Sequence, residues 1–319
     1  MRAGLLLSGR RPAHEAVAIA VEAEHMGVEE VWVSEDYCER GAFALAGAVA
    51  QATSRVRVGL GVVNPWTRHP VLLAMEFAAL DEIAEGRAVL GLGASNARWM
   101  QGDLGIPFER PLGRLRECID ILRPLLAGER VDHVGPVWQV HAQLSFTPAR
   151  TAPPLILGVK GTKAMALAAE TGDGVLLSLL AGPAYVGWVR ETLGPEADVS
   201  SYVALSCDDD ATVARDRIRP LVARFLGIHG EHQITRCAGV DPDLAARFRE
   251  GLMAGTPRTD LVDDALLDAV AVAGDREGCR AGIARLASAG LDGVVLSDDV
   301  PREDLLAVLD AINARRQGA

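Results

Sequence analysis

The sequence predicts an α/β protein, a single TIM barrel of the (β/α)8 type that spans residues 1–319. Short apolar runs alternate with stretches of helical length along the chain, as repeated βα units do. The runs are continuously apolar, which is typical of parallel strands covered on both faces. A length of 319 residues suits one large barrel, although it also suits two ordinary domains. We therefore expect one closed barrel with a full hydrophobic core.

Segments with the composition of buried strands are spread over the whole chain. Each is a short run rich in Val and Leu, and their number matches what a barrel of this class requires. They are Gly4–Ser8, Glu30–Ser34, Val56–Val63, Ala88–Gly93, Leu155–Gly158, Gly174–Ser178, Ser200–Ser206 and Gly293–Ser297.

Apolar residues recur at helical spacing between these strands. Such stripes are typical of helices that turn one face toward a core. The clearest stripes are Ala16, Ile19, Ala20, Ala23 and Met26, then Leu72, Met75, Ala79 and Ile83, and then Cys279, Ile283, Leu286 and Ala287.

A repeated pattern favours the barrel over a doubly wound fold. Residues 25–34 resemble residues 288–297, and residues 170–178 are a shorter copy. Each copy passes from a helix end through a glycine suited to the left-handed position and into a buried strand that ends in Ser. A doubly wound dinucleotide-binding protein also alternates strands and helices, but it opens on a Gly-x-Gly-x-x-Gly loop. Residues 8–12 lack that motif.

Two stretches exceed a minimal barrel. Gly128–Pro154, after the fourth strand, carries spaced valines with Gly-Pro and Pro-Pro pairs, which predicts a β-hairpin. Gly227–Val272, after the seventh strand, is polar and mostly helical, with helix starts expected at Pro242 and Pro257. Active-site loops of a barrel lie at the carboxyl ends of its strands. Both insertions are therefore expected near that rim, as candidate lids or substrate walls.

Composition excludes several classes of protein. A net charge of −11 argues against a non-specific nucleic-acid binder. No apolar run approaches the roughly 20 residues that span a bilayer, and the short apolar run at the N-terminus fits a first strand better than a signal peptide. The five cysteines form no Cys-x-x-Cys pair, so neither a disulfide framework nor a metal site is indicated. We expect a soluble, cytoplasmic protein that acts on a small molecule, with no nucleic-acid or membrane partner.

Polar loops follow several predicted strands, at the end of a barrel where chemistry is expected. They comprise residues 34–40, 59–70, 91–99 and 158–163. Any one of them alone is best interpreted as an ordinary βα turn. Their convergence on one rim favours a binding site.

The loop that begins at Gly158 has the outline of a phosphate site. Gly158 and Gly161 permit close backbone approach, and a helix is expected directly afterwards, so free N–H groups would face the barrel mouth. Lys160 and Lys163 are the only lysines among 32 Lys and Arg residues. A compact ammonium placed beside a phosphate is one interpretation of these lysines. The other is chance retention where arginine replaced lysine elsewhere.

Other polar residues give weaker signals. His69 precedes a proline and could act as a base, but capping the helix that follows is favoured. Glu35 and Asp36 are adjacent on an extended segment, so at most one of them faces the barrel axis. His229 and His232 have no Cys or acid at metal-ligand spacing, and a solvated loop is the favoured interpretation.

In these loops the sequence resembles the luciferase-like flavin and deazaflavin oxidoreductases, also called the bacterial luciferase superfamily. The similarity runs in order along nearly the whole chain, and its most specific part is the Asn-Pro-Trp-Thr-Arg-His-Pro segment. Within the superfamily it is closest to the coenzyme F420-dependent branch, which includes methylenetetrahydromethanopterin reductase. The residues that carry the resemblance are 62–70, 80–93, 158–161, 171–174 and 273–275.

The resemblance implies a role for each loop. The end of the third strand would back the deazaflavin ring, and the loop after the fifth strand would hold the cofactor's phosphate. The implied cofactor-binding residues are Gly61, Val62, Val63, Asn64, Ser95, Gly158, Val159, Lys160, Gly161 and Ser178. Glu35 matches the family's acid after the second strand. Asp36 occupies a position where many members carry His, and Asn96 occupies a position where several members carry an acid that transfers a proton. These three are the candidate catalytic residues.

The family's third strand ends in a non-proline cis peptide bond, and the matching bond here is Gly61–Val62. Glycine eases such a bond because it has no Cβ to clash across it. A trans strand end with a simple bulge is the alternative, which Gly59 and Gly61 permit equally.

Departures from the family pattern bear on the substrate. Leu6 stands where the reductase has Glu, Asp36 replaces His, and Asn96 replaces an acid. The residues that match the cofactor site are kept, whereas those that match the proton-handling groups are changed. This combination implies an F420-dependent reductase or dehydrogenase that transfers a hydride to or from another small organic substrate. The family resemblance also implies a homo-oligomer, expected to be a homodimer. An FMN-dependent monooxygenase of the same superfamily is the alternative. A barrel that binds a cofactor or partner without turnover is a third hypothesis.

Overall fold

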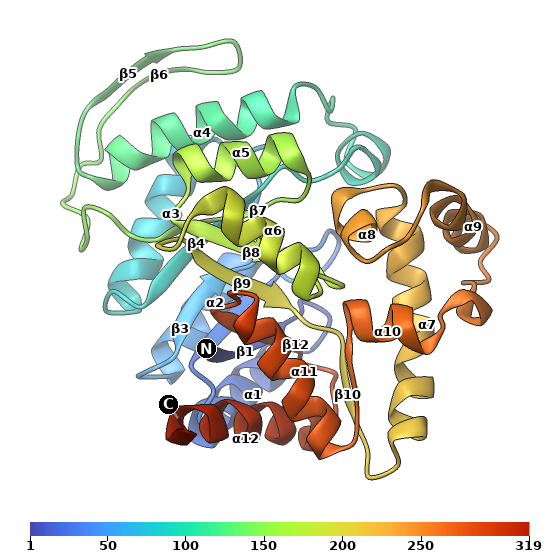
Figure 1. Ribbon diagram of the computed structural model, residues 1–319. Coiled ribbons are helices and arrows are strands. Elements are labelled where there is room, and N and C mark those ends of the chain that lie inside the picture. The colour runs from blue at the N-terminus through green and yellow to red at the C-terminus, as the bar shows by residue number, and fades with distance from the viewer. Residues whose placement is uncertain (319) are drawn as a thin grey trace. The chain divides into compact units, whose positions relative to one another are not determined.

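The computed structural model, which describes residues 1–318, confirms the predicted closed barrel of parallel strands (Figure 1). The barrel strands neighbour one another in the order β1-β12-β9-β8-β7-β4-β3-β2. Each segment predicted as a strand overlaps one of the barrel strands. The barrel strands are β1 (Arg2–Leu7), β2 (Glu30–Val33), β3 (Arg57–Leu60), β4 (Ala88–Gly93), β7 (Leu155–Gly158), β8 (Gly174–Leu177), β9 (Asp198–Tyr202) and β12 (Gly293–Ser297).

Helices follow the strands, and aspartates cap several of those in the second half of the chain. Asp241, Asp263 and Asp275 each accept a hydrogen bond from a backbone N–H three residues on, at 2.8 Å. The helices are α1 (Ala13–Met26), α2 (Ala42–Ala52), α3 (Pro70–Ile83), α4 (Pro111–Leu126), α5 (Thr162–Thr171), α6 (Pro183–Leu193), α7 (Ala211–His229), α8 (Gln233–Cys237), α9 (Pro242–Met253), α10 (Asp264–Val270), α11 (Arg276–Ser288) and α12 (Arg302–Gly318). A π-helical turn, η1 (Arg98–Asp103), and a 3-10 turn, η2 (Thr259–Leu261), complete the set in residues 1–318.

The repeated helix-to-strand pattern is confirmed at two of its three glycines. Gly27 has φ +96° and Gly290 has φ +101°, the left-handed conformation expected after α1 and α11. Gly172 does not adopt it. A Cβ at Gly172 would lie 2.8 Å from Leu157 Cδ1, so this glycine is required by close packing against β7.

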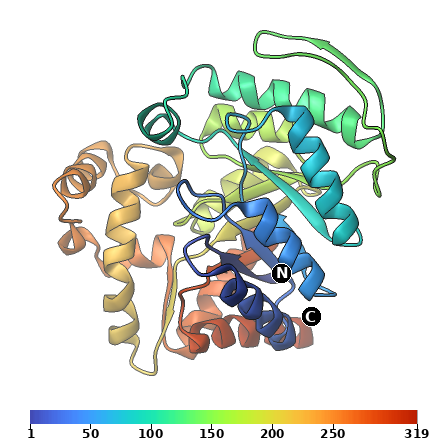
Figure 2. The same cartoon turned by 180° about the vertical axis from the view of Figure 1, so that it is seen from behind.

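The chain divides into two compact units. The first unit comprises Leu5–Val159 and Leu167–Gly174, and the second comprises Met1–Gly4, Lys160–Ala166 and the chain from Val175 onward. In the second unit the two ends of the chain meet, since Arg316 donates to the Met1 carbonyl at 3.2 Å (Figure 2). That residues 1–319 behave as a single domain stays a prediction.

In the first unit, parallel pairing links β2 to β3, β3 to β4 and β4 to β7. Trp32 on β2 lies opposite Gly59 on β3 and is almost fully buried. A Cβ at Gly59 would fall inside contact distance of the indole ring. This glycine therefore makes room for Trp32.

The predicted hairpin is confirmed as β5 (Val131–Val134) and β6 (Gln139–Ala142), an antiparallel pair. The buried Glu117 of α4 anchors its turn, because its carboxylate accepts from the Trp138 N–H at 2.8 Å and lies 3.1 Å from His133 Nε2. The Trp138 ring lies 6.3 Å from the ring of His69, which follows β3. The hairpin turn thus reaches a loop at the carboxyl end of the strands, as expected.

The second insertion is helical, as predicted, but its boundaries differ. α7 continues to His229, so the expected start at residue 227 falls inside this helix. Pro242 begins α9 as predicted. The expectation for Pro257 is wrong, because α10 begins at Asp264, where the Asp263 carboxylate supplies the cap. Leu226 of α7, Phe248 of α9 and Leu267 of α10 belong to one buried hydrophobic cluster, which also includes Leu180 and Ala204.

The predicted seventh strand divides into two strands. β9 ends at Tyr202, and after two residues β10 (Leu205–Cys207) pairs in parallel with β11 (Val272–Gly274), a strand that the sequence did not indicate. β11 is only three residues long, which gives a periodicity argument little to detect.

The apolar stripe predicted to cover a core on α3 is on the wrong face of this helix. Leu72, Met75 and Ile83 are 52%, 45% and 46% exposed, whereas Leu73 and Phe77 are fully buried. Apolar residues surround α3 on nearly every side, so periodicity alone could not show which stripe faces the core. The predicted stripe therefore lies on the exposed face of α3.

No helix in residues 1–318 is both long and apolar enough to cross a membrane.

Candidate active site

The end of β3 forms the floor of the candidate site in the first unit. The Gly61–Val62 peptide bond is cis, which confirms the prediction. Val63 then bridges to β4, because its N–H donates to the Gly91 carbonyl at 3.0 Å and its carbonyl accepts from Gly93 at 2.9 Å.

Glycines surround the Val62 side chain on the neighbouring strands. A Cβ would lie 2.6 Å from Val62 Cγ2 if placed at Gly93, and 2.8 Å from Val62 Cγ1 if placed at Gly158. Real Cβ atoms essentially never approach so closely, so β4 and β7 must carry glycine here. The close approach that the sequence predicted at Gly158 is made at least in part by Val62 of the same chain.

Asn64 is a buried residue that organises the loop after β3. Its Oδ1 accepts from the N–H groups of Trp66 at 2.9 Å and Thr67 at 3.3 Å, and its Nδ2 donates to the Tyr37 hydroxyl. The side chain therefore closes a turn around Pro65. The same amide places a phenol beside the end of β3.

Tyr37 is a polar aromatic residue that sequence reasoning missed. Its ring packs edge-on against Trp99 of η1, with centroids 5.3 Å apart. Burial raises the pKa of its hydroxyl, so the phenol stays protonated at neutral pH. The hydroxyl oxygen accepts from Asn64, and the side chains of Ser95 and Thr67 lie within hydrogen-bonding reach of the same hydroxyl. The signal that could have found it is an aromatic residue directly after two acids at a strand end.

A second aromatic group borders the same loop. The Arg114 guanidinium carbon lies 4.1 Å from the centroid of the Trp66 ring and 5.0 Å from that of the Trp138 ring, a cation between two indoles. The Trp66 ring also packs on Phe108 at 4.8 Å, and its Nε1 donates to the Ala94 carbonyl at 2.9 Å. These contacts join the loops after β3 and β4 to the hairpin, and the sequence did not indicate them.

The two adjacent acids have different partners, as expected for neighbours on extended backbone. Glu35 forms an ion pair with Arg68, in which Glu35 Oε2 lies 2.6 Å from Arg68 Nη1. Asp36 is half-buried. Burial, together with the nearby charge of Glu39, raises the pKa of Asp36. The raised pKa makes Asp36 a candidate for proton exchange.

Asn96 and Ser95 lie in the turn after β4. Asn96 is exposed, and its Oδ1 accepts from the Trp99 N–H at 3.1 Å, so this side chain caps η1. Ser95 has φ +55° and is half-buried. His69 has a similar local role, since its Nδ1 accepts from Val71 N–H at 3.2 Å at the start of α3, as the sequence favoured.

In the second unit, Lys160 and Gly161 precede α5. Gly161 has φ +87°, and α5 begins at the next residue. The Lys160 ammonium lies 3.0 Å from His229 Nδ1, and His229 Nε2 lies 2.9 Å from the Leu179 carbonyl oxygen. Burial lowers the pKa of Lys160. Ser178, the remaining candidate from the sequence, directly precedes Leu179 and is half-buried.

The expectation that His229 and His232 lie in a solvated loop is wrong. His229 is 7% exposed because α7 extends to it and Gly230, with φ +58°, then reverses the chain. Burial and the Lys160 charge lower the pKa of His229 to about 3, and similar causes lower that of His232 to about 4. Both rings are therefore neutral at physiological pH.

Lys160 shows whether these residues fit an anionic cofactor group. No carboxylate within residues 1–318 forms an ion pair with this half-buried ammonium. Lys160 precedes α5 by two residues, and a desolvated cation normally requires a negative partner. A phosphate fits that place. In the first unit, the apolar Val62 floor with Asn64 and Tyr37 at its edge fits a planar ring system.

The model of the family described as luciferase-like monooxygenase matches residues 1–293. The chain belongs to this family. It is a luciferase-like oxidoreductase. It is 30% identical to the 5,10-methylenetetrahydromethanopterin reductase of Archaeoglobus fulgidus over 298 residues, which cover 87% of each chain. It is 29% identical to the reductase of the same name from Methanolobus tindarius over 296 residues, which cover 87% of this chain and 88% of the relative. Its fold superposes on the coenzyme F420 dependent tetrahydromethanopterin reductase from Methanopyrus kandleri with a TM-score of 0.84, at 24% identity and 96% coverage of both chains.

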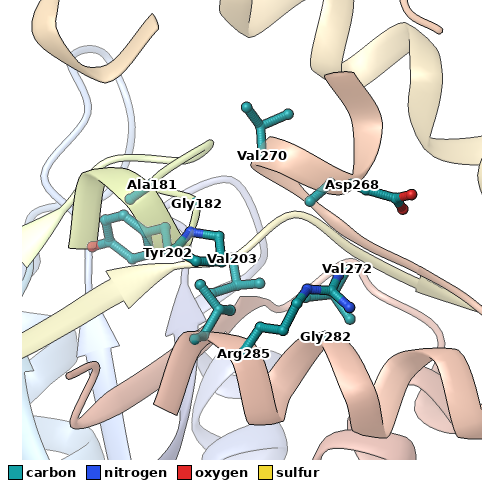
Figure 3. Close-up of a pocket in the computed structure, with 12 residues that line it drawn as sticks. Ala181, Gly182, Tyr202, Val203, Asp268, Val270, Val272, Gly282 and Arg285 are labelled. Carbon is teal, nitrogen blue, oxygen red and sulfur yellow. The ribbon is translucent and has the colours of Figure 1, made fainter. Parts of the chain in front are cut away.

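A separate cavity in the second unit of this luciferase-like protein is too small to matter for binding. It is lined by residues of the segments around Tyr202, Asp268 and Arg285, as Figure 3 shows. Its volume of about 10 Å³ admits at most one water molecule.

Proposed function

We propose that this luciferase-like oxidoreductase uses coenzyme F420 to transfer a hydride to or from a small organic substrate. The observation that carries the proposal is the similarity to two 5,10-methylenetetrahydromethanopterin reductases over 87% of this chain, at 30% and 29% identity. When bound, the deazaflavin would supply the hydride chemistry, and the protein would supply binding, orientation and proton handling.

The residues proposed to hold the cofactor divide between its ring and its phosphate. In the first unit, the Val62 floor and the Asn64 side chain would contact the ring. In the second unit, the Lys160 ammonium and the N–H groups at the start of α5 would bind the phosphate. The whole proposed set is Gly61, Val62, Val63, Asn64, Ser95, Gly158, Val159, Lys160, Gly161 and Ser178.

Asp36 is the proposed proton-handling group. Its raised pKa, caused by burial and the nearby Glu39 charge, brings it toward the range useful for acid–base chemistry. Glu35 is proposed to position the loop after β2 through its ion pair with Arg68. Asn96 cannot exchange a proton and caps η1, so its part would be to shape the loop.

The substrate class follows from what the chain would offer beside the cofactor. A protonated phenol at Tyr37 and a proton-exchanging acid at Asp36 suit a substrate whose carbon accepts or loses hydride while its oxygen or nitrogen changes protonation. An activated C=C, a C=N or an alcohol carbon has this property. Leu6, Asp36 and Asn96 replace groups of the reductase pattern, so a substrate other than methylenetetrahydromethanopterin is proposed.

Binding of each cofactor to the purified protein tests the proposal. Titration of the cofactor-free protein with F420 and with FMN should give micromolar affinity for F420 and negligible affinity for FMN. The reverse preference, with oxygen consumption by reduced FMN, would establish the alternative function, an FMN-dependent monooxygenase. The description of the family as luciferase-like monooxygenase is the observation that favours this second candidate.

A further inference from the structure

We propose that His229 is a positioning residue that holds the Lys160 ammonium toward the phosphate of the cofactor, so that the insertion after β9 takes part in cofactor recognition. The inference rests on the proposed phosphate site at the start of α5. It assigns a function to a histidine that lies 69 positions from the lysine in sequence.

Hydrogen-bond geometry fixes the roles of the three groups. The ammonium of Lys160 can only donate, so His229 Nδ1, 3.0 Å away, must accept. The Leu179 carbonyl can only accept, so His229 Nε2, 2.9 Å away, must carry the proton and donate. These two contacts select a single tautomer of a neutral imidazole. The chain of contacts runs from the backbone after β8, through the ring, to the ammonium.

Packing holds the ring in this orientation. His229 is 7% exposed, and the ring of Phe225, one helical turn earlier on α7, lies 6.1 Å from it at 55°. A buried ring with both nitrogens bonded has little freedom to turn. The lysine side chain, which has four rotatable bonds and would otherwise sample many conformers, therefore gains a fixed end point.

A neutral acceptor suits this position better than a carboxylate. Asp or Glu beside Lys160 would neutralise the ammonium and repel an incoming phosphate, whereas a neutral imidazole leaves the positive charge intact. The titratable groups that face His229 are Lys160 and His232, and burial keeps both rings neutral. One ammonium N–H bonds to His229, and the other two remain for a ligand.

Two substitutions separate the roles of the two ring nitrogens. In His229→Gln, the longer amide reaches the place of Nε2 and keeps the bond to Leu179, but nothing accepts from Lys160. In His229→Asn, the shorter amide reaches the place of Nδ1 and keeps an acceptor for Lys160. Each variant is first compared with the wild type by circular dichroism and thermal unfolding.

The readout is the affinity for two ligands that share the deazaflavin: F420, which carries the phosphate-linked tail, and the same deazaflavin without that tail. We expect His229→Gln to weaken F420 at least about tenfold, roughly 1.4 kcal/mol, and to leave the phosphate-free ligand unchanged. His229→Asn should stay within about threefold of the wild type for both. A merely structural role would weaken both ligands alike, so that result overturns the proposal. Equal loss of F420 affinity in both variants overturns it as well.

The failure of the proposed cofactor is distinguishable from the failure of this inference. If the wild type binds FMN instead of F420, the pair FMN and riboflavin gives the same comparison, and a selective effect of His229→Gln on FMN supports the inference. If the wild type binds the phosphate-free and phosphate-bearing ligands equally, no phosphate site exists, and the inference is overturned with it. If His229→Gln does not fold, His229→Leu, which likewise offers Lys160 no acceptor, takes its place and must show the same selective loss of F420 affinity, with His229→Asn as the reference.

Discussion

Replacing Gly161 by valine tests whether the loop before α5 is a binding loop or only a connector. Gly161 has φ +87°, a conformation that costs an L-residue roughly 1–2 kcal/mol and a β-branched residue more. Its Cβ would also lie 2.9 Å from His232 Nε2, the far end of a side chain that can move, so the backbone term dominates. The loop would relax to another φ and carry the first N–H groups of α5 out of place.

We expect Gly161→Val to weaken cofactor binding at least tenfold, about 1.4 kcal/mol, in a fluorescence titration. The series Gly161→Asn, Gly161→Ala and Gly161→Val should lose affinity in that order, because asparagine tolerates the left-handed conformation best. Gly187→Ala is the matched control. Gly187 lies inside α6 in the same unit, nothing lies within 4 Å of its Cβ position, and only a small gain in stability is expected. Unchanged affinity in Gly161→Val would show that the loop is only a connector.

Three further predictions concern other parts of the protein. Burial raises the pKa of Asp36 in the folded state, so ionisation of Asp36 lowers the stability of the fold at pH values above the ordinary pKa of aspartate. At lower pH the carboxyl is protonated in both the folded and the unfolded state, and the effect disappears. Asp36→Asn should therefore raise the Tm at neutral pH and leave it unchanged in acid. Arg114→Leu should remove two cation–π contacts and lower stability by about 1–2 kcal/mol in chemical denaturation, and Arg114→Lys should restore only part of it. We propose that the exposed apolar stripe of α3 is covered by a second copy of the chain, so Leu72→Glu with Met75→Glu should reduce the mass measured by light scattering, whereas Val213→Glu, at an exposed site on α7, should leave it unchanged.

The strands of the barrel could be predicted because both their faces are buried. A continuous apolar run of about four to eight residues is then enough to indicate a strand, and each predicted segment overlaps a strand of the barrel. On a helix, apolar residues on every side prevent the sequence from showing which face is buried. On α3, Leu72 and Leu73 are equally apolar, and only the fold decides that Leu73 is buried and Leu72 is exposed.

Contacts between residues far apart in sequence could not be predicted. Lys160 stood out in the sequence by its rarity, but its partner His229 carries no local pattern, and two histidines in a polar stretch are typical of a solvated loop. Tyr37 presented a similar difficulty, since its importance depends on Asn64, 27 positions later. Composition and periodicity depend on residues that are close in sequence, so they cannot indicate contacts between residues that are far apart in sequence.

The two adjacent acids after β2 show how a distant residue divides chemically equal groups. Glu35 and Asp36 are both carboxylic acids at a strand end, and the sequence alone made both candidates for catalysis. Arg68 decides between them, because it binds Glu35 at 2.6 Å and also Glu76, with Nε 2.8 Å from Oε2. Arg68 belongs to the segment after β3 that carries the most specific resemblance to the family. That segment therefore does more than shape the loop around Asn64: it also holds the Glu35 carboxylate in an ion pair, while its neighbour Asp36 has a pKa raised by burial.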